Sequence, residues 1–188
     1  MSGIRLVEIE DAPRLAAIYE PMVRDSVVSF EVDPPGPAEM AARIETVTAT
    51  HPWLVLAENG DVVGYAYATS HRQRPAYRWS TETTIYMHPG HQNRGLGKRL
   101  YSALLELATL WGYANAYAGI TLPNPRSQAL HAAVGFAQIG IFPRAGFKMG
   151  EWHDVGWWHR ALAEPSPQPP EPGPPPAEQT ALLLAAFS

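Results

Sequence analysis

The sequence contains no cysteine, and this absence removes several kinds of chemistry. Disulfides, thiolate metal sites and covalent catalysis through a cysteine thiol are all excluded. A protein without cysteine also fits a reducing compartment such as the cytoplasm. Any catalysis must therefore rest on other side chains.

Positive charge and long hydrophobic runs are scarce as well. The 14 Lys and Arg are outnumbered by 18 Asp and Glu, which gives a formal net charge of −4. No general attraction to nucleic acid or to an anionic membrane is expected, so a bound phosphate would need a local site. Residues 1–10 lack the apolar stretch of a secretory signal, and no later run is long enough to span a bilayer. We expect a cytoplasmic protein that binds neither nucleic acid nor membrane.

Proline is concentrated near the C-terminus, where residues 165–176 read Pro-Ser-Pro-Gln-Pro-Pro-Glu-Pro-Gly-Pro-Pro-Pro. Such a segment cannot form a helix or join a sheet, and it is expected to be extended and flexible. The apolar residues 177–187 are expected either to dock on the domain as a short helix or to be disordered. We therefore predict one domain at 1–163 and a flexible tail at 164–188.

Hydrophobic periodicity and turn residues predict alternating strands and helices before the tail. Asp11 and Pro13 start a helix that runs to about Arg24, and Asn59-Gly60 favours a tight hairpin. The expected strands are 4–9, 53–58, 62–69, 80–87 and 114–120, with two more within 136–162, and the other expected helices are 37–50, 96–111 and 127–134. The predicted order is βααβββαβαββ.

A glycine-rich loop, Gln92-Asn93-Arg94-Gly95-Leu96-Gly97, precedes the most regular of these helices. A strand that runs into such a loop and then into a helix offers phosphate free N–H groups and a favourable dipole. The loop is not a Walker A motif, because Arg99 stands where that motif needs Ser or Thr. It is not a dinucleotide fingerprint, because Leu100 stands where a third glycine is needed. A glycine-rich helix start without a ligand remains the alternative.

The spacing Gln92-x-x-Gly95-x-Gly97 resembles the acyl-CoA pyrophosphate loop of the GNAT acetyltransferase superfamily. Asn124, Ser127 and His131, followed by Gly135-Phe136, resemble a second motif of that superfamily. Across residues 4–162, several segments look like the phosphinothricin N-acetyltransferase family: 28–30, 52–55, 76–77, 122–124, 145–148 and 152–156.

This resemblance implies an α/β (α+β) GNAT acyl-CoA N-acyltransferase fold, in which about four helices flank a mixed, mostly antiparallel sheet and two central parallel strands splay apart. It also implies acetyl-CoA as the cofactor. Asn124 is well placed to cap the helix that follows it, and that role is compatible with cofactor binding. The residues assigned to the cofactor are Ile85, Tyr86 and Met87 through their backbone, the loop residues Gln92, Asn93, Arg94, Gly95, Leu96, Gly97 and Lys98, and Asn124 and Ser127.

Two residues are candidates for proton transfer. Glu82 lies in the middle of the predicted strand 80–87, on the face that also carries Thr84 and Tyr86. A carboxylate there can serve as the base that acyl transfer to an amine requires, directly or through water. By resemblance, His131 lies near the cofactor thiol, where it protonates the thiolate or orients the substrate. The alternatives are an ion-paired or edge-strand glutamate and a helix-surface histidine.

The resemblance also implies an amino-acid-like acceptor that bears a carboxylate and a phosphinate or sulfoximine. Arginine suits such oxyanions, although solvated loop arginines are the alternative. The sequence departs from phosphinothricin acetylating enzymes at Thr121, where those have glycine. The residues assigned to the acceptor are Phe30, Arg72, Arg74, Tyr77 and Val155.

The remaining histidines and tryptophans are expected to have structural roles. His88 and His91 are close in sequence, but no third ligand lies nearby, so no metal is expected. Trp152, Trp157 and Trp158 on the terminal strands are expected in the core or in a subunit interface rather than in a platform for nucleic acid. The resemblance implies a homodimer.

The predicted function is transfer of the acetyl group of acetyl-CoA to the α-amine of a small amino-acid-like acceptor, of the phosphinothricin or methionine sulfoximine type. Because no cysteine can carry the acetyl group, we expect direct transfer in a ternary complex and sequential kinetics. One alternative is another amine, such as an antibiotic, a polyamine or a protein N-terminus. A second is a non-catalytic acyl-CoA-binding module whose tail docks a partner.

Overall fold

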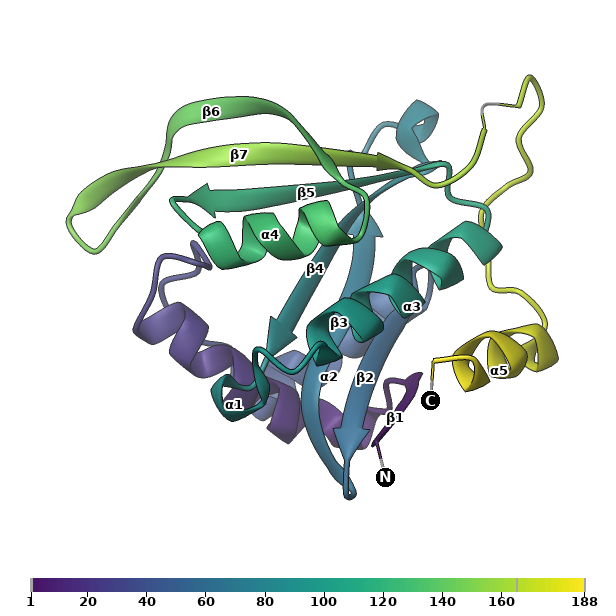
Figure 1. The fold of residues 1–188 in the computed structure, drawn as a ribbon, viewed down its shortest axis with the longest axis horizontal. Helices are drawn as coiled ribbons and strands as arrows, with labels where there is room; N and C mark the ends of the chain where they lie inside the picture. Colours follow the sequence, from purple (N-terminus) through teal and green to yellow (C-terminus); the bar gives the residue numbers. More distant parts are fainter. Residues whose placement is uncertain (1, 165, 188) are drawn as a thin grey trace.

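The computed structural model describes residues 2–164 and 166–187, in which one seven-stranded sheet carries helices on both faces (Figure 1). The strands are β1 Ser2–Leu6, β2 Trp53–Glu58, β3 Asp61–Ser70, β4 Ser80–Met87, β5 Asn115–Leu122, β6 Ala137–Lys148 and β7 Glu151–Ala161. The helices are α1 Ala12–Arg24, α2 Pro37–Thr48, α3 Leu96–Leu110, α4 Pro125–Ala133 and α5 Ala177–Ala185. The predicted order βααβββαβαββ is confirmed, with α5 following in the tail.

The first strand is shorter than the sequence predicts. The apolar pattern continues to residue 9, but β1 ends at Leu6 and the chain turns through a 3₁₀ helix at Ile9–Asp11. The Asp11 carboxylate fixes this turn, because it accepts a hydrogen bond from the Glu8 backbone N–H at 2.9 Å and pairs with Arg5 at 2.7 Å. A buried carboxylate and its partners therefore end the strand before the hydrophobic pattern does.

The sheet opens near its middle. Its order is β1-β2-β3-β4-β5-β7-β6, and β4 and β5 are the neighbours that run parallel. Their pairing extends from Ser80–Asn115 to Glu82–Tyr117, after which the two strands diverge (Figure 1). Beyond Glu82, the β4 edge that faces β5 has no strand partner within the described residues. This opening is where a ligand can reach the backbone of a central strand.

One hydrophobic cluster lies on each face of the sheet. Helices α1 and α2 contribute to one cluster, into which Tyr86 of β4 packs. Helix α3 dominates the other, into which Ile85 and Met87 pack. The period of two predicted for β4 is thus confirmed, and it places Glu82 on the Tyr86 face.

The β6–β7 hairpin reaches over the loop between α1 and α2 (Figure 1). The Lys148 ammonium donates hydrogen bonds to the backbone oxygens of Val23 at 2.6 Å and Ser29 at 2.7 Å. Tyr19 of α1 holds the same loop through a 2.6 Å hydrogen bond to the Ser29 hydroxyl. This loop carries Phe30, so the hairpin and α1 together fix one wall of the site.

The tail returns to the domain. Helix α5 lies beside α3 and β1 in Figure 1, and its Leu184 is buried in the α3 cluster. Of the two outcomes left open for residues 177–187, docking as a helix is the one observed. The division at 163 and the flexibility of the tail stay predictions. No helix in the described part of the chain combines the length and apolar character needed to cross a bilayer.

Candidate functional site

A cavity of about 90 Å³ lies where β4 and β5 diverge. It brings together several residues that the sequence assigns to one site but that lie far apart along the chain. Its walls are formed by β4, β5, the α4 helix and the loop after α1, through Val28, Thr83, Thr84, Ile85, Tyr86, Gly119, Ile120, Thr121, Asn124, Ser127 and His131. Thr121 is buried in this wall, so the departure from glycine noted in the sequence lies at the cavity itself.

The glycine-rich loop meets the far end of β4 and starts α3. Gly95 takes the left-handed conformation, with φ of 76°, and no side chain caps the helix. As in any helix, the N–H groups of the first turn of α3 have no acceptor within the helix, and here no side chain replaces one. The turn also contains no acidic residue. This geometry is suited to an anion such as phosphate.

Side chains of the loop stabilise its shape. The Gln92 amide donates to the Met87 carbonyl at 3.1 Å, which ties the loop to the end of β4. Arg94 pairs in a bidentate manner with Glu58 of β2, at 2.8 and 3.1 Å. That pair neutralises a carboxylate beside the helix start, where a negative charge would oppose phosphate. Asn93, with φ of 62°, accepts a hydrogen bond from Arg126.

The start of α4 confirms the predicted cap. The Asn124 side-chain oxygen accepts a hydrogen bond from the Ser127 backbone N–H at 3.1 Å. Both residues also line the cavity, so the capping bond leaves them beside the opening of the sheet. Their contact with a cofactor stays a prediction.

His131 is buried, with 4% of its surface exposed, and both its ring nitrogens have partners. Nδ1 lies 2.7 Å from the Ser127 carbonyl oxygen, so this nitrogen carries a proton and donates it. Nε2 lies 3.0 Å from the Tyr101 hydroxyl, which lies 2.7 Å from the Thr83 hydroxyl. Tyr101 is fully buried on α3. We call His131, Tyr101 and Thr83 the α3-side network.

The α3-side network can satisfy His131 in either charge state. In the neutral state, Tyr101 donates to Nε2 and Thr83 can donate to Tyr101. In the protonated state, Nε2 donates to Tyr101, Tyr101 donates to Thr83, and Thr83 donates to the Tyr117 carbonyl 3.2 Å away. Burial lowers the pKa of His131, which favours the neutral state at neutral pH. The role of His131 as an acid stays a prediction.

Glu82 lies at the point where β4 and β5 part. Its side chain is 32% exposed, and one carboxylate oxygen lies 3.0 Å from Nδ1 of His71. His71 follows β3, and its ring stacks on Tyr117 of β5 at a centroid distance of 4.3 Å. The predicted base thus has a histidine partner that no motif in the sequence indicated.

The predicted acceptor residues do not form one cluster. Phe30 lies against the β6–β7 hairpin, where a β-carbon on Gly146 would collide with its ring. Val155 of β7 pairs with Thr121 of β5, and the Arg72 guanidinium lies 5.9 Å from the centre of the Trp157 ring. Val155 and Trp157 share one face of β7. Arg72 and Val155 are therefore on the sheet face that carries Glu82.

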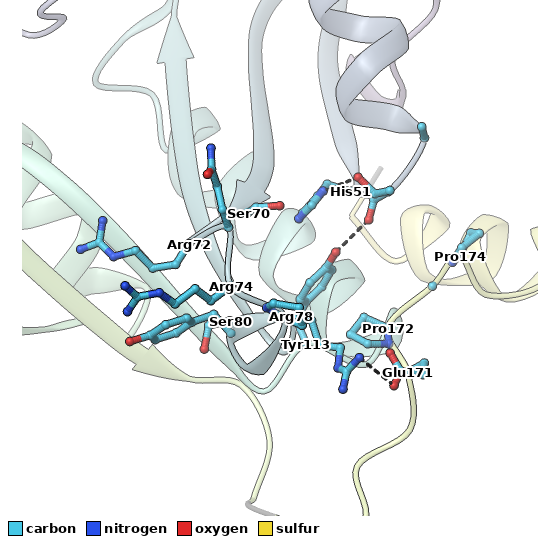
Figure 2. Close-up of a pocket in the computed structure, with 16 residues that line it drawn as sticks. His51, Ser70, Arg72, Arg74, Arg78, Ser80, Tyr113, Glu171, Pro172 and Pro174 are labelled. Atoms are coloured by element: carbon cyan, nitrogen blue, oxygen red, sulfur yellow. Dashed lines mark hydrogen bonds and ion pairs between the residues drawn. The ribbon is translucent and has the colours of Figure 1, made fainter.

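Arg72, Arg74 and Tyr77 also border a second hollow, of about 470 Å³, between their loop and the tail. Figure 2 shows Arg72 and Arg74 extending away from Pro172 and Pro174. Arg78 instead pairs with Glu171 of the tail at 3.4 Å. The loop thus presents two arginines on one side and contacts the tail on the other.

His88 and His91 lie beside each other, with their Nδ1 atoms 3.4 Å apart. His91 is also 3.7 Å from the Glu58 carboxylate. Among residues 2–164 and 166–187, no group of three or more His, Cys, Asp or Glu side chains is placed to hold a metal ion.

Sequence reasoning missed His71 and Tyr101. The antiparallel register of β3 and β4 pairs Thr69 with Glu82, so a residue two positions after Thr69 extends the same face. The predicted strand limits, 62–69 and 80–87, do not give this register, so the sequence alone could not indicate His71. Tyr101 occupies an ordinary core position of α3, and nothing in the helical pattern distinguishes it from a packing residue.

Comparison with known proteins gives a consistent assignment. A model of the acetyltransferase (GNAT) family matches residues 16–136. The phosphinothricin N-acetyltransferase of Streptomyces viridochromogenes is 38% identical over 167 residues, which cover 89% of this chain and 91% of that protein. The L-methionine sulfoximine/L-methionine sulfone acetyltransferase of Salmonella typhimurium is 38% identical over 114 residues, or 61% of this chain and 67% of that protein.

A solved structure extends the likeness to the fold. A GNAT superfamily phosphinothricin acetyltransferase from Sinorhizobium meliloti, in complex with AcCoA, superposes with a TM-score of 0.86 at 37% identity. The match covers 93% of this chain and 96% of that one.

Proposed function

This chain belongs to the acetyltransferase (GNAT) family, and we propose that it moves the acetyl group of acetyl-CoA to the α-amine of a small amino-acid-like acceptor, of the phosphinothricin or methionine sulfoximine type. It is accordingly an acetyl-CoA-dependent N-acetyltransferase. The observation that carries the proposal is the opening of the sheet between β4 and β5, with an uncapped helix start at one end and the Glu82 carboxylate at the other.

The residues present fit the cofactor. The first turn of α3, from Leu96 to Lys98, would hold the pyrophosphate through backbone N–H groups. The unpaired backbone of β4 from Ile85 to Met87 would bond the amide groups of the pantetheine arm, as a neighbouring strand would. Asn124 and Ser127 face the same cavity from α4. When bound, acetyl-CoA supplies an activated acyl group and a thiol leaving group.

Glu82 acts on the acceptor ammonium. The carboxylate oxygen that is not bonded to His71 takes one proton, which leaves the amine with the lone pair that forms the new C–N bond. That proton passes to solvent, because Glu82 is partly exposed. The second ammonium proton ends on the thiol as the C–S bond breaks. His131, in the wall of the cavity, is the candidate that carries it, through Nε2, which has to release its hydrogen bond to Tyr101 to do so.

Arginine supplies the recognition of an anionic acceptor. Arg72 lies over Trp157 on the face that carries Glu82, and Arg74 extends to the same side of the loop in Figure 2. Guanidinium groups bind carboxylate and phosphinate oxygens in a bidentate manner. Phe30 and Val155 would supply apolar walls. The names of the relatives support this acceptor class.

We also propose that the protein is a homodimer and that it is located in the cytoplasm. The edge strand β6 and the hairpin expose apolar side chains, including Ile141, Phe142, Phe147 and Trp152. Such a surface suits a partner subunit. Light scattering should give twice the chain mass, and Phe147→Glu with Trp152→Glu should give the mass of one chain. The cysteine-free sequence supports the location.

The proposal is tested by thiol release from acetyl-CoA with a panel of acceptors: phosphinothricin, methionine sulfoximine, ordinary amino acids and polyamines. We expect turnover with the first two, and Glu82→Gln should lower kcat by about 100-fold or more. Acetyl-CoA affinity, measured by calorimetry, should stay the same in this variant. If wild type and variant both bind acetyl-CoA and neither releases thiol, the non-catalytic alternative is correct. If polyamines turn over faster than the first two compounds, the proposed acceptor class is wrong and the acceptor is a polyamine.

A further inference from the structure

His71 is placed to control the geometry of Glu82. Its Nδ1 lies 3.0 Å from Oε1 of the carboxylate, and the two side chains are 12% and 32% exposed. The Thr69–Glu82 pair in the β3–β4 register brings the two residues to one face of the sheet. A carboxylate oxygen only accepts, so Nδ1 carries the proton of this hydrogen bond.

Aromatic rings from three elements fix the plane of the His71 ring. Tyr117 of β5 stacks on it at 4.3 Å with an interplanar angle of 15°. Tyr77 and Trp157 meet it edge-on, at 5.9 and 6.0 Å. An imidazole held in this way can direct a hydrogen bond only along one line. Glu82, partly exposed on its strand, is therefore restrained through one oxygen.

We propose that His71 is a positioning residue for Glu82: it holds Oε1 and leaves Oε2 directed to the acceptor amine. This inference rests on the proposed role of Glu82 as the base. His71 keeps its Nδ1 proton throughout, and the proton taken from the ammonium stays on Glu82 until solvent removes it.

The other titratable and charged groups around the pair are few. Tyr77 and Arg72 face it from the loop after β3, Tyr117 from β5, and His159 from β7 on the far side of the Tyr117 ring. The His159 ring packs on Tyr117 in a tilted arrangement, with the ring centroids 4.9 Å apart, but its Nε2 bonds Asn115 at 2.9 Å instead of a carboxylate. His159 is therefore a matched control for His71.

The test compares five variants by steady-state kinetics. His71→Phe keeps a ring on Tyr117 and removes the donor, whereas His71→Asn offers an amide N–H near the position of Nδ1. We expect His71→Phe to lower kcat about 10- to 100-fold, the value of a charge-assisted hydrogen bond. Acetyl-CoA affinity should not change. His71→Asn should recover part of the loss, and His159→Phe should match wild type.

Glu82→Gln separates this inference from the proposed function. Adding His71→Phe to Glu82→Gln should cost less than threefold, because a positioning residue has no effect once its target is gone. If Glu82→Gln is inactive and His71→Phe equals His159→Phe in rate, the positioning role is wrong and the proposed function stands. If Glu82→Gln keeps full activity, both are wrong.

Discussion

Two histidines lie on opposite faces of the same opening in the sheet, and their surroundings differ in kind. His131 is enclosed on the α3 side, where the Ser127 carbonyl and the Tyr101 hydroxyl occupy its two ring nitrogens. His71 lies on the other face, where one ring nitrogen meets a partly exposed carboxylate and aromatic rings hold its plane. One histidine belongs to a closed network of neutral groups, and the other is bonded to a partly exposed carboxylate.

The difference shows that burial and partners, more than residue type or motif, decide what a histidine can do. The motif Asn-x-x-Ser-x-x-x-His identifies His131, whose partners already satisfy it. No motif identifies His71, whose single carboxylate partner is the candidate base. We therefore expect His131 variants to lose stability as well as rate, and His71 variants to lose mainly rate.

The largest expected effect in this comparison is on stability. His131→Ala should lower the free energy of unfolding by about 2–4 kcal/mol, because it leaves a cavity and removes the Tyr101 partner. His71→Ala should cost less, about 1 kcal/mol, because it loses ring contacts and one hydrogen bond but leaves Glu82, which is partly exposed, able to bond water. Urea denaturation of both variants measures the contrast. Equal losses would mean that the two sites are not structurally distinct.

Tyr101→Phe tests whether the α3-side network is cooperative. Removing the hydroxyl leaves His131 Nε2 without a partner, while Thr83 keeps the Tyr117 carbonyl. The expected cost is about 1–3 kcal/mol. Tyr113→Phe, which removes a single bond to the Thr50 carbonyl, is the control and should cost about 1 kcal/mol. A smaller loss for Tyr101→Phe than for Tyr113→Phe would show that the network adds nothing.

The pH dependence of stability should report on His131. Because burial lowers its pKa in the folded state, the unfolded state takes up a proton first as the pH falls. Stability should be complete above the unfolded value of about 6.5 and should decline as the pH falls from there toward the folded value. His131→Gln should flatten this slope, and His51 and His88, whose pKa values burial also lowers, should supply the remainder. An unchanged slope would show that His131 is charged in the native protein.

The smallest effect concerns the loop that carries His71, which the tail contacts. Glu171→Gln removes the exposed pair with Arg78, and Trp79→Phe removes the bond to the Pro170 carbonyl. Each contact contributes about 1 kcal/mol or less, so the acceptor KM should rise at most about fivefold. Steady-state kinetics measure this rise, with the KM for acetyl-CoA as the internal control. If the KM for acetyl-CoA rises more than the KM for the acceptor, the tail contact supports cofactor binding and not acceptor binding.

Local features of the fold and site were predictable from sequence. The start of α3 at Gly95, the Asn124 cap and the alternation along β4 depend on residues close in the chain. Contacts that depend on tertiary packing were not predictable in the same way. The Tyr101–His131 bond joins α3 to α4, and the Arg94–Glu58 pair joins the loop before α3 to β2. The end of β1 was missed because a side-chain bond between Arg5 and Asp11 outweighed hydrophobic alternation.

The contact between Trp79 and Pro170 joins residues 91 positions apart. Two-thirds of residues 165–176 are proline, so the backbone of this segment supplies acceptors and few donors. Gly173 uses one of those few donors on the Trp111 carbonyl at 2.8 Å. Contacts of such long sequence separation generally form late, after the local hairpins and helices. The loop that presents His71 should thus gain its last anchor only when the sheet is complete. In the order of folding, acceptor recognition would be finished after cofactor recognition.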